Sequence, residues 1–98
     1  MIIGCPKEVK AQEFRVGLTP NAVKELVLQD HTVFIEKNAG IGSGFTDKNY
    51  KDAGAKIILS AEELFHGSEM IVKVKEPQEA ERKLLKKDQV LFTYLHLA

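Results

Sequence analysis

Short apolar runs alternate with segments of helical pattern along this chain, and that alternation limits its fold more than any other feature. The apolar runs have the character of strands and cover residues 1–5, 31–36, 56–59, 70–75 and 89–94. Strands that alternate with helices indicate βαβ units, whose right-handed crossovers give a parallel sheet with helices on both faces. The sequence therefore predicts an α/β fold, a mostly parallel, doubly wound, Rossmann- or flavodoxin-like sheet of about five strands.

Capping residues mark where the helices begin. Thr19 precedes a proline at a first helical position, where the missing N–H costs nothing, and Thr46 is placed to cap a short helix. Ser60 and Glu63 predict a capping box, in which the hydroxyl and the carboxylate each satisfy a backbone donor of the other residue. The charged stretch 79–87 predicts an exposed helix.

Composition narrows the classes of function. The 98 residues fit one small domain, and fourteen basic residues balance fourteen acidic ones. Without a net charge, we expect neither nucleic acid nor an anionic membrane as a partner. No apolar run approaches the ~20 residues that span a bilayer, and the chain opens on a strand rather than a signal peptide, so a cytoplasmic setting is expected. Cys5, the single cysteine, excludes an internal disulfide and is expected to pack in the core.

Glycines and histidines do not match the usual cofactor or metal motifs. Gly40, Gly42 and Gly44 form G-x-G-x-G, which differs from the dinucleotide fingerprint G-x-G-x-x-G and favours a tight loop with positive φ over a phosphate cradle. The histidines lie too far apart for a helical zinc pair, so no metal site is predicted. We expect His31 and His66 to be solvated at the surface.

Arg15, Lys75 and His96 follow the predicted strands at their C-terminal ends. In an open α/β sheet these ends border the crevice in which ligands bind, so residues distant in sequence can meet there. A guanidinium suits a bidentate grip on a carboxylate, and a histidine between leucines suits acid–base chemistry near neutral pH. Simpler interpretations stay open. Arg15 could be an exposed loop charge, and Lys75 alternates with Lys73 as on a sheet face turned to water.

Five segments resemble the amino-terminal part of bacterial alanine dehydrogenases, in order over the whole chain. They are G-C-P-K-E at 4–8, E-F-R-V at 13–16 running to T-P at 19–20, A-G-I-G-S-G-F at 39–45, K-V-K-E-P at 73–77 and L-F-T-Y-L-H-L-A at 91–98. The resemblance implies an NAD-dependent enzyme that interconverts L-alanine with pyruvate and ammonia. It also implies a substrate domain, with residues 1–98 as its amino-terminal portion, and a separate NAD-binding domain in a homo-oligomer, usually a hexamer.

Carried over position by position, the family's substrate-binding arginine falls on Arg15, its substrate-binding lysine on Lys75 and its catalytic histidine on His96. By this resemblance Arg15 and Lys75 hold the substrate carboxylate, and Lys75 also polarises the carbonyl oxygen of pyruvate. His96 moves a proton as carbinolamine and imine interconvert. Glu8 and Tyr94 lie in the same motifs and are expected to shape the pocket.

The chain stops directly after a predicted strand, so we expect an interrupted domain, with the NAD-binding domain beyond Ala98 and no dehydrogenase activity in the isolated chain. One alternative is the amino-terminal region of a proton-translocating nicotinamide nucleotide transhydrogenase. It shares the G-x-P-x-E and E-x-R-V segments but usually lacks the lysine at position 75 and the histidine at position 96. A stand-alone, non-catalytic binding module is the other alternative, although a module should carry a helix after its last strand.

Overall fold

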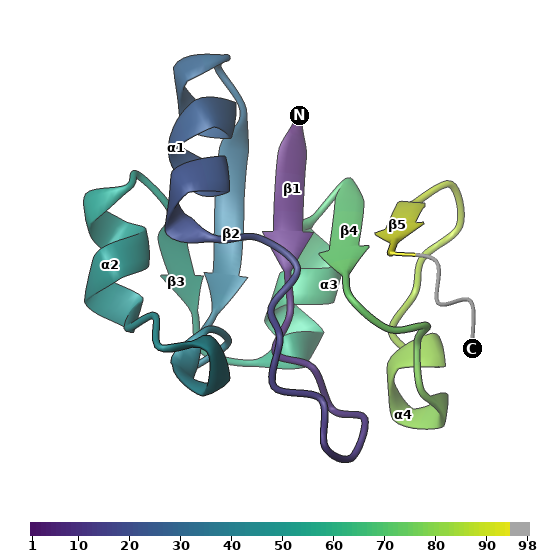
Figure 1. The fold of residues 1–98 in the computed structure, drawn as a ribbon. Coiled ribbons are helices and arrows are strands. Elements are labelled where there is room, and N and C mark those ends of the chain that lie inside the picture. Colours follow the sequence, from purple (N-terminus) through teal and green to yellow (C-terminus); the bar gives the residue numbers. More distant parts are fainter. Residues whose placement is uncertain (95–98) are drawn as a thin grey trace.

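A five-stranded sheet forms the centre of the molecule in the computed structural model, which describes residues 1–94 (Figure 1). Its strand order is β3-β2-β1-β4-β5, and every neighbouring pair is parallel. The strands are β1 (Ile2–Cys5), β2 (Thr32–Glu36), β3 (Lys56–Ile58), β4 (Met70–Lys73) and β5 (Val90–Thr93). The chain builds outward from β1 to one side and then, from β4, to the other. The predicted doubly wound α/β fold is therefore confirmed.

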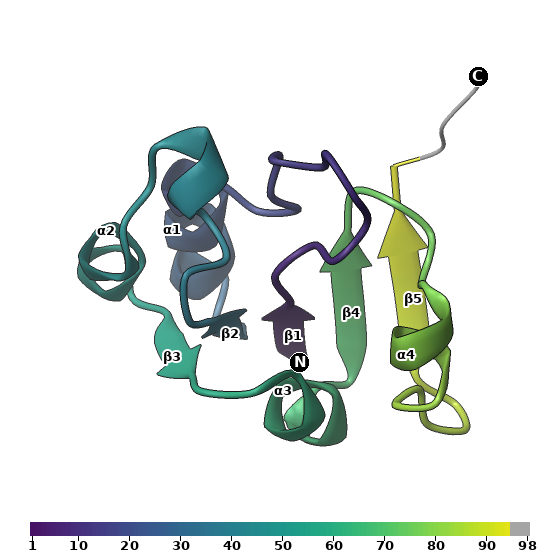
Figure 2. The ribbon, with the colours of Figure 1, turned by 90° about the horizontal axis from the view of Figure 1, so that it is seen from below.

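Helices cover both faces of the sheet (Figure 2). One face carries α1 (Pro20–Leu28) and α2 (Asp47–Asp52), and the other carries α3 (Ala61–Gly67) and α4 (Glu79–Arg82). A short 3-10 turn, η1 (Ile41–Ser43), precedes α2. None of the helices within residues 1–94 has the length and apolar character needed to cross a membrane.

The helix starts follow the capping signals closely. The Thr19 hydroxyl accepts the Ala22 N–H at 3.2 Å, and Thr46 with Asn49 completes a reciprocal capping box at α2. At α3 the Ser60 hydroxyl accepts the Glu63 N–H at 3.2 Å, as predicted. The other half of that box was predicted wrongly, because the Glu63 carboxylate accepts the Ser60 hydroxyl proton at 3.3 Å instead of a backbone N–H.

Alternation along the strands divides the core into two apolar clusters. Val33 and Ile35 of β2 join the cluster under α1 and α2, whereas Phe34 packs with the cluster under α3. In β4, Ile71 and Val72 divide in the same way. Successive side chains of a strand point to opposite faces, so a sheet covered on both sides has an apolar residue at nearly every position.

Cys5 is completely buried in the larger cluster, as predicted. Burial disfavours the thiolate and raises the pKa of this thiol to about 12. At neutral pH the group is therefore an inert thiol that packs like a small apolar side chain.

The glycine stretch at 40–44 forms a tight loop around the ring of Tyr50. A Cβ on Gly40 would lie 2.6 Å from the ring carbon Cε2, and Gly44 adopts a left-handed φ of 85°. Tyr50 is fully buried, and its hydroxyl donates to the Leu18 carbonyl at 2.8 Å. These glycines therefore serve the packing of a buried aromatic ring and the turn that follows it.

Three predictions about exposed polar segments were wrong. The helix expected over 79–87 ends at Arg82, because the following Leu84 and Leu85 turn in to pack against the cluster under α3. The strand expected to reach Lys75 ends at Lys73, whose side chain is buried rather than turned to water. His66 is exposed as expected, but His31 is half-buried at the entry to β2, and its Nδ1 has no hydrogen-bond partner within residues 1–94.

Replacing the buried phenol tests how much this packing depends on one polar contact. Tyr50→Phe keeps the ring but leaves the Leu18 carbonyl without its donor, so we expect the free energy of unfolding to fall by about 1 to 3 kcal/mol. Urea denaturation of the wild type and the variant measures the difference. An unchanged midpoint would show that the hydrogen bond contributes nothing to stability.

Candidate functional site

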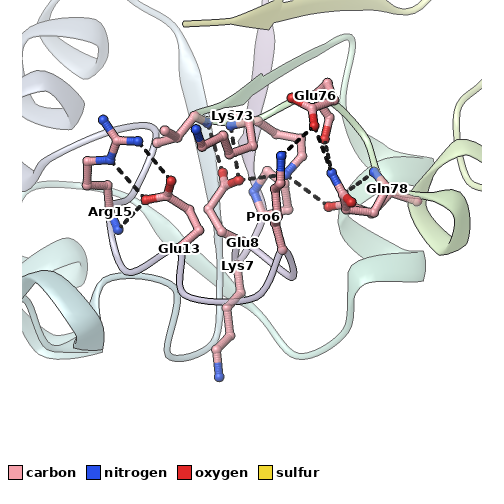
Figure 3. Close-up of polar contacts among 12 residues, drawn as sticks. Pro6, Lys7, Glu8, Glu13, Arg15, Lys73, Glu76 and Gln78 are labelled. Atoms are coloured by element: carbon pink, nitrogen blue, oxygen red, sulfur yellow. Dashed lines mark hydrogen bonds and ion pairs between the residues drawn. The ribbon is translucent and has the colours of Figure 1, made fainter. Parts of the chain in front are cut away.

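The C-terminal ends of β1 and β4 lie side by side at the point where the strand order reverses. Beyond them lie the loop that follows β1 and the segment that joins β4 to α4, and Figure 3 shows the polar contacts between these two segments. In open α/β sheets, ligands bind outside the carboxyl ends of the strands at such a switch point. The topology therefore brings Arg15 and Lys75 to the same end of the sheet, on the two segments that follow β1 and β4.

Arg15 is exposed, and Glu13 holds it in place. Its Nε and Nη2 donate to the two carboxylate oxygens of Glu13 at 3.0 and 2.9 Å, and its own backbone N–H donates to the same carboxylate at 2.8 Å. Arg15, principally through these hydrogen bonds, lowers the pKa of Glu13 to about 2. A guanidinium has five N–H donors, so this grip leaves donors free for a second carboxylate.

Glu8 is buried and joins the loop after β1 to the end of β4. Its carboxylate accepts hydrogen bonds from the Lys73 ammonium at 2.9 Å, the Val74 N–H at 2.9 Å and the Lys75 N–H at 3.3 Å. Figure 3 shows Glu8 between the two segments, with the side chain of Lys7 pointing away from them. Glu8, which was expected to shape the pocket, is thus a buried residue that connects the two segments.

Lys73 is paired with a second buried carboxylate. Its ammonium lies 3.1 Å from Oε2 of Glu81, which belongs to α4, and the side chains of Lys73 and Glu81 are 1% and 4% exposed. The contact is an ion pair without hydrogen-bond geometry, and Oε2 has no other polar partner in the described part of the chain. The other oxygen of Glu81 accepts the Gln78 N–H at 2.9 Å and caps α4.

Lys75 differs from its neighbours in having an uncommitted charge. The residue is half-buried, and its positive charge contributes to the lowered pKa of Glu13, so the two side chains lie in the same electrostatic environment. Within residues 1–94 its ammonium forms no ion pair, in contrast to Lys10, Arg15 and Lys73. Among residues 1–94, no carboxylate therefore competes with an anionic ligand for this ammonium.

A third bridge between the two segments lies at the surface. The Lys10 ammonium donates to the Glu76 carboxylate at 3.0 Å, and this bond is the main cause of a Glu76 pKa of about 2. The Gln78 amide donates to the backbone carbonyl of Glu76 at 2.8 Å (Figure 3). Because both charged side chains are well exposed, we assign this bridge to local order rather than to global stability.

Two open cavities flank Arg15. One, of about 420 Å³, lies toward the first half of the loop and is lined by Lys7, Glu8, Lys10, Gln12, Glu13, Phe14, Arg15, Asn38, Ala39, Ile41 and Gly42. The other, of about 390 Å³, is lined by Arg15, Val16, Gly17, Thr19, Ala22, Ser43, Phe45, Val74 and Tyr94. Neither lining includes Lys75. Arg15 is common to both cavities and could reach a small acid in either.

Tyr94 closes one side of the second cavity. Its hydroxyl donates to the Gly17 carbonyl at 2.6 Å and so ties the end of β5 to the loop that carries Arg15. His96, the predicted catalytic residue, lies outside the described residues.

The glycine loop does not fit a dinucleotide. Atoms of this chain already occupy the space beside Gly40 and Gly42, where added Cβ atoms would lie 2.6 Å from the Tyr50 ring and 2.8 Å from the backbone carbonyl oxygen of Phe14. The helix that follows, α2, has six residues and begins after Thr46 rather than at the glycines. Among residues 1–94 no group of three metal-ligating side chains comes together.

The buried carboxylate partners of Lys73 were not predicted from the sequence. The alternation of Lys73 with Lys75 left a water-facing side of the sheet open as an interpretation, but β4 ends at Lys73 and the alternation stops there. A lysine inside the run M-I-V-K-V was the available signal, since a buried ammonium needs carboxylates nearby. Glu13 could have been predicted from its place two residues before Arg15.

The fold and the gathered charges define a Rossmann-like α/β domain whose candidate crevice lies between β1 and β4. The chain belongs to the family described as "Alanine dehydrogenase/PNT, N-terminal domain", whose model matches residues 4–98. The resemblance seen in the sequence motifs is thereby confirmed.

Similar proteins include alanine dehydrogenases of other organisms and two solved structures. The chain is 55% identical to an alanine dehydrogenase of Methanococcus maripaludis and 57% identical to one of Staphylococcus haemolyticus, in each case over all of this chain and 26% of the relative. The chain thus spans about a quarter of these relatives. A structure titled L-alanine dehydrogenase matches with a TM-score of 0.93 and 59% identity over 98% of this chain and 26% of that one. A transhydrogenase of Sinorhizobium meliloti matches with a TM-score of 0.89 and 28% identity over 97% and 27%.

The pairing of Glu13 with Arg15 predicts a pH dependence. The folded pKa of Glu13 lies below its ordinary value of 4.5, so the pair stabilises the loop above about pH 4.5 and loses that effect as the pH falls toward 2. We expect carboxyl NMR titration of Glu13 to give a midpoint near 2, and a midpoint back toward 4.5 in Arg15→Gln. A wild-type midpoint near 4.5 would contradict the pairing.

Proposed function

We propose that this chain is the amino-terminal part of the substrate domain of an NAD-dependent L-alanine dehydrogenase. In the net reaction, L-alanine, NAD⁺ and water give pyruvate, ammonium, NADH and a proton, and the reverse reaction aminates pyruvate. The observation that carries the proposal is the placement of Arg15 and Lys75 on the two sides of the switch point between β1 and β4. The high identity to alanine dehydrogenases supports it.

Substrate binding would use both cations. Arg15, oriented by Glu13, has N–H donors left for the substrate carboxylate. Because Glu13 neutralises the positive charge of Arg15, the Lys75 ammonium would supply the positive charge that balances the substrate carboxylate. In the amination direction Lys75 would also donate to the carbonyl oxygen of pyruvate, where negative charge develops as ammonia adds. Alanine and pyruvate are three-carbon acids with one carboxylate, and this carboxylate suits a site that contains Arg15 and Lys75.

Proton transfer is assigned to His96. The imidazole would accept and return a proton while carbinolamine and imine interconvert, a task suited to a group that titrates near neutral pH. We propose that NAD binds in a part of the full-length enzyme outside these residues, because atoms of this chain already fill the space beside Gly40 and Gly42. The full-length enzyme is proposed to be a cytoplasmic homo-oligomer.

The related transhydrogenases are the competing assignment within the same fold. Identity of 59% to the solved dehydrogenase, against 28% to the solved transhydrogenase, favours the dehydrogenase. Lys75 and His96 favour it further, because the corresponding transhydrogenase motifs usually lack both residues.

Substitution of the two cations in the full-length protein tests the assignment. We expect Lys75→Met and Arg15→Gln each to lower kcat/KM for pyruvate by about 10²-fold or more, as loss of a transition-state donor does. Lys51→Met, which removes an exposed lysine of α2, is the matched control and should change kcat/KM less than twofold. NADH oxidation with pyruvate and ammonia is the assay. Wild-type protein that transfers hydride between nicotinamide nucleotides and ignores alanine would instead support a transhydrogenase.

A second expectation concerns the 98 residues alone. Purified by itself, this chain should give no alanine-dependent NADH formation, because we place cofactor binding elsewhere. Absorbance at the NADH band with saturating alanine and NAD⁺ is the measurement, and the full-length protein is its positive control. Turnover by the isolated chain would require a nucleotide site within it.

A further inference from the structure

We propose that Glu8 is a positioning residue for Lys75, holding the backbone from which the lysine side chain projects. The inference rests on the substrate-binding role proposed above for Lys75. Glu8 touches neither the reacting atoms nor the ammonium of Lys75 in this assignment. It acts through the main chain at positions 74 and 75.

The turn after β4 needs such support because backbone pairing with the neighbouring strands ends before it. On the β1 side, the described register pairs end at Gly4↔Ile71, and on the β5 side they end at Lys73↔Thr93. The chain of β1 leaves the sheet at Pro6, so its backbone is not available to the amides that follow Lys73. The Glu8 side chain takes over this place and accepts the N–H groups of Val74 and Lys75 at 2.9 and 3.3 Å.

Glu8 is itself held firmly. Its Oε1 accepts the Lys73 ammonium at 2.9 Å, and that ammonium is also paired with Glu81 of α4. The side chains of Glu8 and Lys73 are 2% and 1% exposed, so water cannot replace these contacts freely. The Glu8 carboxylate thus holds both the Lys73 side chain at the end of β4 and the backbone N–H groups of Val74 and Lys75.

A carboxylate is required at this position because both of its oxygens accept. A glutamine has one oxygen and one NH₂ group, so it must turn a donor toward either the Val74 N–H or the Lys73 and Lys75 donors. At least one of the three contacts then becomes a donor–donor contact. Glu8→Gln changes neither the shape of the side chain nor the positive charge of Lys73, and it leaves Lys73 its pairing with Glu81.

The experiment compares Glu8→Gln with a matched control in the full-length protein. Glu69→Gln is the control because the Glu69 carboxylate also accepts a hydrogen bond from a backbone N–H, that of Ile2 at 2.6 Å. This contact lies at the N-terminal ends of β1 and β4, away from the candidate site. Two readouts are taken: amide hydrogen exchange at Val74 and Lys75 by mass spectrometry with fragmentation, and KM values for pyruvate, ammonia and NADH. Thermal midpoints report the folded state of each variant.

We expect Glu8→Gln to speed exchange at Val74 or Lys75 by about tenfold or more and to raise the KM for pyruvate by about tenfold, equivalent to about 1.4 kcal/mol. The KM for NADH and all values of Glu69→Gln should stay within twofold of wild type. If Glu8→Gln does not fold, Glu8→Asp is measured instead, since it keeps the charge beside Lys73 and withdraws the carboxylate by one methylene.

Two results overturn the inference. One is unchanged exchange at both amides; the other is faster exchange with an unchanged KM for pyruvate or with an equal rise in the KM for NADH. Failure of the proposed function is seen separately, as wild-type protein without alanine-dependent activity. The exchange experiment then still decides whether Glu8 holds the turn, because it does not depend on turnover.

Discussion

A buried ammonium placed between two buried carboxylates holds together the part of the sheet at which the candidate site lies. Lys73 comes from β4, Glu8 from the loop after β1 and Glu81 from α4, so three segments converge on one charge. Taking these groups out of water is costly, and the cluster is stable only because each charge has a partner. Removal of one member of such a pair typically costs about 3 to 5 kcal/mol, since the remaining charge stays buried. The orientation of both segments at the crevice depends on this cluster.

Local signals in the sequence were enough to predict most of the fold. The alternation of apolar runs gave the α/β class, and Thr19 and Thr46 marked the starts of α1 and α2 correctly. The end of β4 and the length of α4 could not be predicted in this way. Both depend on tertiary contacts: Lys73 at the end of β4 meets Glu8, 65 residues away, and Leu84 and Leu85 after α4 pack against the cluster under α3. Contacts at that separation leave no trace in periodicity.

The candidate site was predictable in its location and less so in its detail. Arg15 and Lys75 were expected at one sheet edge, and the topology places both there. The control of Arg15 by Glu13 was missed, although the two residues are neighbours in sequence. The open interpretation of a water-facing sheet side is wrong for Lys73, because its tertiary partner Glu8 outweighs the usual preference of a charged strand residue for solvent. The role of His96 stays a prediction.

The pairing of β1 with β4, where the two halves of the sheet meet, affects how the candidate site can change through amino-acid substitution. Backbone pairing between β1 and β4 is confined to two register pairs, and side chains carry the connection beyond them. Hydrogen bonds of a backbone ladder persist through most substitutions because every residue supplies the same groups. Bonds made by a side chain can be lost, weakened or redirected by a single codon change. Natural variation can therefore adjust the distance between the loop after β1 and the segment that follows β4, while the pairing of the strands beneath them stays the same.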